Sequence, residues 1–194
     1  MRLSNVEQGR GAIGKLKLFA ASRVLGDRVP DVLRVLLYRS EFFGRDFARY
    51  TNQLMRGPSE WTAGERELFA AYVSRVNTCA FCTSLHCTMA SNVVGTEVVD
   101  AVLADWRTAP VSPRLRAAFA FLEKLMKQPR QLGPGDVRDA FAAGISEAGL
   151  LTVVHVCVNF SIINRIADAL GFETPSATTV ARLGNILLGL GYRF

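Results

Sequence analysis

Two cysteines and a histidine share one face of a predicted helix. Cys79, Cys82 and His86 fall within about 60° of one another around a helix axis, because each residue advances about 100°. His86 lies one turn after Cys82, where its imidazole could accept the thiol proton. Cys79 is expected near the helix start, where unpaired backbone N–H groups and the helix dipole favour a thiolate. Such surroundings lower a thiol pKa from about 8.5 to roughly 3.5–7.5, so the spacing predicts a nucleophile at neutral pH.

A CxxC pair of this kind can cycle between a dithiol and a disulfide. Only the thiolate attacks a peroxide or a disulfide, and the second cysteine can then close a disulfide on the first. The residues alone also allow a purely structural role for the two cysteines and the histidine. Free cysteine is often buried as a small hydrophobic residue, and His86 would then be a hydrogen-bonded core histidine.

A zinc site is a second chemical interpretation. Cys79, Cys82, His86 and Cys87 are all possible ligands. Cys87 points about 100° away from His86 on a helix, and a tetrahedral site usually needs a second chain segment. His155 and Cys157 could supply that segment, but in an apolar helix both are expected to be core residues. The sequence therefore favours no metal and no other cofactor.

Size and composition predict one ordinary domain. Of the 194 residues, 49% are hydrophobic, which is enough for a sizeable core. The 23 Lys and Arg against 17 Asp and Glu leave a charge of +6, and the basic residues are scattered, most densely over 15–39. Nucleic-acid-binding proteins more often concentrate this charge on one face, so a solvated basic surface is expected instead.

Neither a membrane span nor export is predicted. The most apolar segment, 149–163, is shorter than a bilayer span and contains His155 and Asn159. No secretory signal is recognisable near the N-terminus, which predicts a cytoplasmic protein. In that reducing compartment a CxxC pair is more often catalytic or metal-binding than structural.

Helical periodicity and capping residues recur along the whole chain, so we predict an all-helical fold of about eight to ten helices. Thr62 with Glu65 forms a capping box, and Asn77-Thr78 separates the next helix from the one before it. The expected helices cover about 30–40, 42–55, 62–76, 79–93, 95–109, 114–127, 136–143, 146–171 and 176–194, with a loop at 128–135. We predict one domain over 1–194, with an N-terminal extension at 1–28, a core motif at 62–93 and a C-terminal helix at 176–194. Exposed apolar stripes predict a homo-oligomer.

Glu67 lies twelve residues before Cys79, which is about 18 Å along one straight helix. It can therefore reach the cysteines only if the chain folds back near Asn77, or if another subunit brings it there.

The segment from Glu65 to His86 resembles the core motif of the AhpD-like alkylhydroperoxidases, which belong to the carboxymuconolactone decarboxylase superfamily. The shared pattern is a Glu, eleven residues, Cys, two residues, Cys, three residues and His, and each spacing is met. Trp61-Thr62, Ala143 to Ser146 and Asn164 to Asp168 are similar to the peroxidase-related branch. The resemblance covers roughly 30–172.

This resemblance implies an all-helical, oligomeric thiol peroxidase that reduces an alkyl hydroperoxide or hydrogen peroxide. In such a protein Cys82 attacks the peroxide, Cys79 resolves the product into a disulfide, and His86 and Glu67 relay protons. A dithiol reductant, such as a lipoyl or thioredoxin-like protein, would then restore the thiols. The founding hydroperoxidases place a histidine immediately before the second cysteine, whereas this chain has Phe81. A non-catalytic thiol switch or disulfide-exchange protein, and a zinc-binding helical oligomer, stay open as alternatives.

Overall fold

The computed structural model describes residues 1–9, 11–38 and 40–193, so Arg39 at the end of the basic stretch lies outside the described residues. The described residues form helices and no strands, which confirms the all-helical prediction. The α-helices are α1 Ser4–Gln8, α2 Gly11–Leu25, α3 Asp31–Tyr38, α4 Arg45–Arg56, α5 Ala63–Val76, α6 Ala80–Val94, α7 Thr96–Asp105, α8 Pro113–Lys127, α9 Pro134–Ala142, α10 Glu147–Leu170 and α11 Ala177–Leu190. A π-helical turn, Ser40–Gly44, precedes α4, and a 3-10 turn, Pro129–Gln131, lies in the expected loop. The described helices are more numerous than expected because the N-terminal extension folds into α1 and α2.

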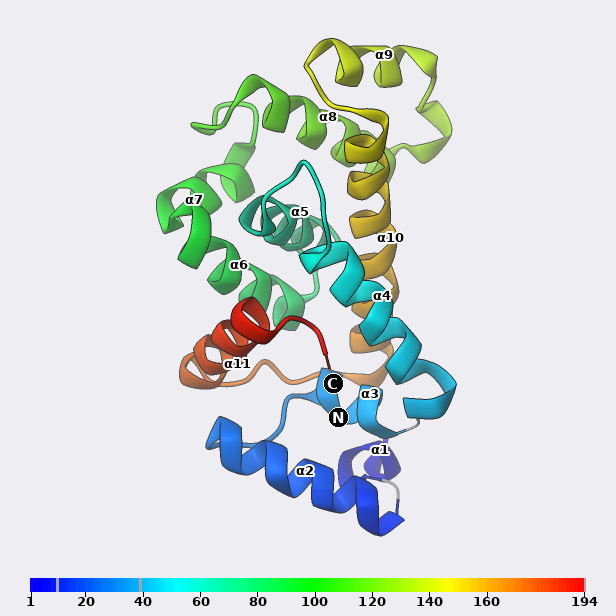
Figure 1. Ribbon diagram of the computed structural model, residues 1–194, viewed down its shortest axis with the longest axis vertical. Helices are drawn as coiled ribbons and strands as arrows, with labels where there is room; N and C mark the ends of the chain where they lie inside the picture. Colours follow the sequence, from blue (N-terminus) through cyan, green and yellow to red (C-terminus); the bar gives the residue numbers. More distant parts are fainter. Residues whose placement is uncertain (10, 39, 194) are drawn as a thin grey trace.

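The hairpin of α5 and α6 forms the centre of the molecule. Figure 1 shows this hairpin between the long helix α10 on one side and α7 and α11 on the other. Every residue from Arg66 to Ser74 in α5 is buried, and this burial on all faces marks α5 as the core helix. The hairpin therefore carries any functional side chain on α5 or α6 into the protein interior.

The start of α5 is fixed by the capping box read from the sequence. The Thr62 backbone N–H donates to Glu65 Oε2 over 2.8 Å, and Glu65 N–H donates to Thr62 Oγ1 over 3.2 Å. Arg66 holds the preceding turn, because its Nη1 donates to the carbonyl oxygens of Leu54 (2.7 Å) and Gly57 (2.9 Å) at the end of α4. These contacts satisfy helix-end groups that have no partner within their own helix.

The chain reverses between α5 and α6 at Asn77 and Thr78. Thr78 has φ of 58°, a left-handed conformation that is rare for a β-branched residue. The Asn77 amide donates to Asn164 Oδ1 of α10 over 3.0 Å, and the Cys79 backbone N–H donates to the Ser74 carbonyl over 3.0 Å. This turn is the fold-back that Glu67 needed in order to reach the residues of α6.

Helix α10 runs for 24 residues, from Glu147 to Leu170, as the helix expected over 146–171 predicted. The apolar segment 149–163 within it is shorter than a bilayer span, but the whole helix is not. It is the one described helix that could cross a membrane by length and composition, and half of its most apolar window is buried inside the protein. A core helix has these same properties.

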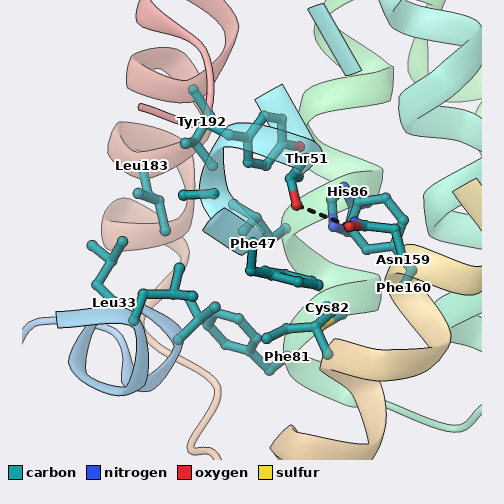
Figure 2. A pocket seen from close by; sticks show the side chains of 16 residues that line it. Leu33, Phe47, Thr51, Phe81, Cys82, His86, Asn159, Phe160, Leu183 and Tyr192 are labelled. Atoms are coloured by element: carbon teal, nitrogen blue, oxygen red, sulfur yellow. Dashed lines mark hydrogen bonds between the residues drawn. The ribbon is translucent and has the colours of Figure 1, made fainter. Parts of the chain in front are cut away.

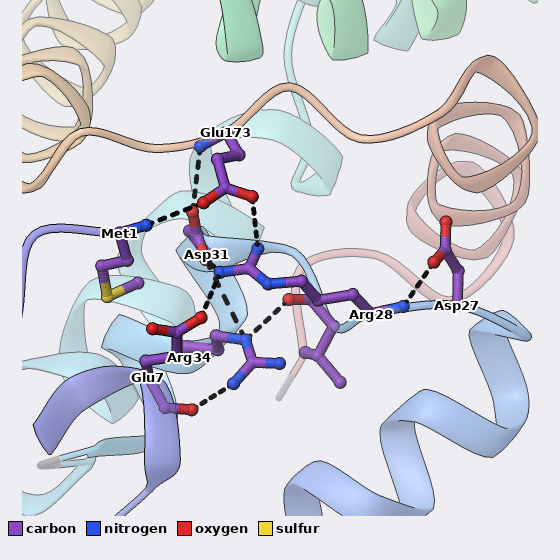
Figure 3. A network of polar contacts seen from close by, with 8 residues as sticks. Met1, Glu7, Asp27, Arg28, Asp31, Arg34 and Glu173 are labelled. Atoms are coloured by element: carbon purple, nitrogen blue, oxygen red, sulfur yellow. Dashed lines mark hydrogen bonds and ion pairs between the residues drawn. The ribbon is translucent and has the colours of Figure 1, made fainter. Parts of the chain in front are cut away.

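The N-terminal part of the chain is tied to the segment between α10 and α11 by a polar network (Figure 3). Asp31, fully buried at the start of α3, accepts a hydrogen bond from the Glu173 backbone N–H over 2.9 Å. Arg28 pairs with Asp31 (2.8 Å) and with Glu7 of α1 (3.1 Å). Arg34 donates to the Val29 carbonyl over 2.9 Å and also to the Glu7 carbonyl. The network holds α3 against the rest of the protein.

Candidate active site

The two cysteines lie at the start of α6, as the spacing predicted. Cys79 is the residue that precedes the first turn, and Cys82 lies within that turn. Both are free thiols and both are buried, with 3% and 2% of their surface exposed. The helix start supplies backbone N–H groups to Cys79, because residues there have no partner in a preceding turn.

Glu67 and His86 meet across the α5–α6 hairpin. His86 Nδ1 and Glu67 Oε2 are 2.6 Å apart, and both side chains are buried. The structure thus brings together within one chain two residues that lie 19 positions apart in the sequence. A carboxylate that accepts the Nδ1 proton leaves the other ring nitrogen, Nε2, as an acceptor in the neutral imidazole.

Two further residues hold Glu67, and no pattern in the sequence points to either. Arg56 at the end of α4 donates to Glu67 Oε1 over 2.7 Å. Tyr192, just after α11, donates its hydroxyl to Oε1 and Oε2 over 2.9 and 3.1 Å. The Arg56 guanidinium also lies 5.0 Å from the centre of the Tyr192 ring. Both residues are distant in sequence from the CxxC motif, and neither belongs to a recognisable spacing.

This environment keeps Glu67 ionised. Burial by itself raises the pKa of a carboxyl group, but the hydrogen bond and charge of His86, followed by the charge of Arg56, outweigh it and lower the pKa of Glu67 below its ordinary value. Burial, followed by the charge of Glu67, raises the pKa of Tyr192 well above its ordinary value, so the phenol stays protonated and donates.

The two thiols share a proton unequally. The hydrogen bond from the Cys82 thiol, with help from the Cys82 backbone N–H and the Asn164 amide, lowers the pKa of Cys79 from 9.0 to about 7. The Cys82 thiol donates a hydrogen bond to Cys79, and this bond together with burial raises the pKa of Cys82 well above its ordinary value. Cys79 is therefore the more acidic of the two thiols, and Cys82 is the one that holds its proton more tightly.

A cavity of about 40 Å³ lies beside Cys82 and His86 (Figure 2). Its walls come from α3, α4, α6, α10, α11 and the segment that follows α11, and most of the lining is aliphatic or aromatic. Phe81, which stands where the founding hydroperoxidases have a histidine, also lines it and packs edge-on against Phe172 at 5.7 Å. Cys82 lines this cavity, whereas Cys79 is not among its lining residues.

The structure offers no support for the zinc interpretation. In the described part of the chain, no three His, Cys, Asp or Glu side chains are grouped so that they could hold a metal ion. Cys157 is buried as expected, but His155 is only half-buried, so its assignment to the core was wrong. His155 Nδ1 instead pairs with the Tyr50 hydroxyl of α4 over 2.8 Å, at the outer edge of the α4–α10 contact.

Comparison with known proteins points to one family. Residues 43–124 match the carboxymuconolactone decarboxylase family. No functionally curated protein matches the sequence.

Several solved structures share the fold. An uncharacterized peroxidase-related protein from Silicibacter sp. TM1040 superposes with a TM-score of 0.75 at 23% identity, covering 85% of this chain and 86% of that one. An AhpD-core, peroxidase-related protein from Ralstonia eutropha JMP134, also uncharacterized, gives 0.75 at 22% identity over 92% and 93%. The debrominase Bmp8, solved as a cysteine-to-alanine variant with 2,3,4-tribromopyrrole, gives 0.71 at 16% identity over 96% and 100%. At these identities the likeness concerns the fold.

Proposed function

We propose that this chain belongs to the carboxymuconolactone decarboxylase superfamily and is a thiol-dependent peroxidase, because residues 43–124 match that family and the fold is that of AhpD-like proteins. The observation that carries the proposal is the position of Cys82. Its thiol lines the same cavity as His86, and the imidazole of His86 is fixed by an ionised, buried Glu67. A nucleophile, a general base and the group that orients the base are the parts that such a reaction needs.

The first step oxidises Cys82. His86 Nε2 accepts the Cys82 proton, and the thiolate attacks the terminal oxygen of a hydroperoxide ROOH. The S–O bond forms as the O–O bond breaks, which gives Cys82 sulfenic acid. The leaving RO⁻ takes the proton from the His86 imidazolium and departs as ROH.

The second step uses Cys79. Its thiolate attacks the sulfur of the sulfenic acid, a Cys79–Cys82 disulfide forms, and hydroxide leaves and is protonated to water. A thiol with a pKa of about 7 is substantially ionised at neutral pH, which suits this resolving role.

A dithiol protein of the lipoyl or thioredoxin type would reduce the disulfide by thiol exchange and become oxidised itself. This cycle suits a reducing compartment, and the proposal includes a cytoplasmic location. The proposal also includes a homo-oligomer, supported by Leu151, Val158 and Ile162, which are exposed along one side of α10.

Peroxide turnover with dihydrolipoamide as the electron donor tests the proposal. We expect donor oxidation with the wild-type protein and none with Cys82→Ser, whereas Cys79→Ser should still form a trappable sulfenic acid after one turnover. Equal activity of the two variants would refute the assigned roles. No turnover, with a Cys79–Cys82 disulfide still forming on oxidation, would favour a thiol switch that senses oxidants.

The Bmp8 likeness and the apolar lining of the cavity suggest one second candidate, for which the cavity of about 40 Å³ would have to widen to hold the ring. A dithiol can also replace bromine by hydrogen on an aromatic ring, giving the disulfide and HBr. Bromide release from 2,3,4-tribromopyrrole in the same assay, exceeding the rate of peroxide turnover, would move the assignment to dehalogenation.

A further inference from the structure

One polar group in the cavity wall has no partner. Asn159 of α10 is fully buried, and its Nδ2 amide makes no hydrogen bond within the described residues. The other half of its carboxamide is fixed, because Thr51 Oγ1 of α4 donates to Asn159 Oδ1 over 2.9 Å (Figure 2). A buried donor without an acceptor destabilises the fold, so such groups in native proteins usually have a ligand or a water as partner.

The other polar groups that line the cavity are already engaged. The Tyr192 hydroxyl donates to Glu67, His86 Nδ1 pairs with Glu67, and the Thr51 hydroxyl donates to Asn159. Two groups are then left for a bound molecule, the Asn159 amide and His86 Nε2, and the sulfur of Cys82, whose proton is donated to Cys79, lies in the same wall. All three residues line this cavity.

Charge and size limit what can bind there. None of the described lining residues is an Asp, Glu, Lys or Arg, so a carboxylate or ammonium group on the ligand would be buried without a partner. The volume of about 40 Å³ corresponds to about three water-sized groups, since one water needs roughly 10–15 Å³ measured in this way. A benzene-sized ring occupies a cavity of roughly 150 Å³ on the same scale.

We propose that this cavity binds a small, neutral hydroperoxide with an alkyl group of one or two carbons, and that Asn159 Nδ2 donates a hydrogen bond to its oxygen. The alkyl group contacts the apolar wall that includes Phe47 and Leu183. The amide donor faces the oxygen that carries the developing negative charge when the O–O bond breaks, so its contribution increases in the transition state. The identification of the ligand as a hydroperoxide rests on the proposed peroxidase function. The binding of a small, neutral molecule does not.

Binding is tested without turnover by using the product alcohols on the Cys82→Ser protein. In an NMR titration, ethanol should shift the Asn159 side-chain amide signals at millimolar concentration, whereas the bulky cumyl alcohol should not. Cumyl alcohol should shift them once Phe47→Ala has enlarged the cavity. An Asn159 amide that does not respond to saturating ethanol, or that responds equally to both alcohols in Cys82→Ser, would overturn the proposal.

Activity gives the second readout. The double variant Thr51→Val/Asn159→Leu replaces both hydrogen-bond partners by apolar groups of similar shape, which protects the fold. We expect its kcat/KM for ethyl hydroperoxide to fall about 10- to 100-fold. Asn185→Leu, the same change at an exposed asparagine of α11, should leave this rate unchanged. An unchanged rate in the double variant would refute the role of Asn159.

The two proposals can fail separately. If ethanol shifts the Asn159 amide but no hydroperoxide is turned over, the peroxidase assignment fails and the ligand class of the cavity stands. If hydroperoxides are turned over but cumene hydroperoxide reacts as fast as ethyl hydroperoxide, the peroxidase stands and the size limit fails.

Discussion

At the residue scale, the thiol that lines the cavity and the more acidic thiol belong to different cysteines. Cys82 lines the cavity, whereas Cys79 has the lowered pKa because it accepts hydrogen bonds at the start of α6. A low pKa and access to the substrate are therefore properties of different cysteines. In the proposed mechanism, proton transfer to His86 makes Cys82 reactive, so the orientation of His86 by Glu67 is a central requirement.

The thiolate on Cys79 gives a pH prediction. Ultraviolet absorbance of the reduced protein should show one thiolate forming with a midpoint near pH 7, and Cys79→Ser should abolish this step. Cys82→Ala should move the midpoint upward, because the hydrogen bond from Cys82 is the largest cause of the shift.

The folded pKa of Cys79 is lower than its ordinary 9.0, so the thiolate stabilises the reduced fold fully above about pH 9, and this contribution is lost as pH falls through about 7. A wild-type midpoint near 9 would contradict the assignment.

At the element scale, the close contact of α5 with α6 is what lets Glu67 meet His86. Gly64 in the first turn of α5 lies against the end of α6, where an added Cβ would come within 2.6 Å of Val93 Cγ1 and 2.9 Å of Val94 Cγ1. Valine side chains are stiff, so they cannot move aside without displacing the helix. The glycine thus sets the spacing of the hairpin.

Gly64→Ala should force the hairpin apart. We expect a loss of about 1–3 kcal/mol in the free energy of unfolding, measured by urea denaturation, which is typical of overpacking. Gly135→Ala in α9, where the nearest atom to an added Cβ is 3.8 Å away, is the matched control and should change stability little. Equal effects of the two substitutions would show that packing at Gly64 does not limit the hairpin.

Sequence reasoning predicts the elements better than the contacts between them. Periodicity and caps such as Thr62 and Ser146 are local signals, and they located most of the helices before the structure was considered. The contact between Glu67 and His86 depends on a turn whose geometry is set by Thr78. From the sequence one could say only that Glu67 would need such a turn in order to reach the cysteines. Arg56 and Tyr192 were missed because tertiary packing alone brings them to Glu67. The unpartnered amide of Asn159 was missed for the same reason.

At the scale of the whole molecule, segments far apart in the sequence enclose the cavity, from α3 to the residues after α11. Helix α3 supplies Leu33 and Leu36 to the wall, and the network around Asp31 holds this helix in place. The N-terminal part of the chain therefore contributes to the site although it lies outside residues 43–124, which match the family.

Removing the buried carboxylate should loosen that wall. Asp31→Ala leaves the Glu173 N–H without its acceptor and removes one of the partners of Arg28, which keeps Glu7, and we expect about 1–3 kcal/mol of destabilisation. Amide hydrogen exchange should become faster in α3 and stay unchanged in α5. Asp46→Ala, which removes an exposed ion pair with Arg49, should alter neither. Unchanged exchange in α3 would show that the network does not hold it.

The hydroxyl of Tyr192 reaches a carboxylate 125 residues earlier in the chain. Ribosomes add about 5–20 residues per second, so Glu67 is made roughly 6 to 25 seconds before the phenol that helps to hold it. The CxxC motif is completed soon after Glu67, so for most of that interval both cysteines exist while the Tyr192 hydroxyl does not. The nascent chain therefore has both thiols before it has every contact that holds Glu67.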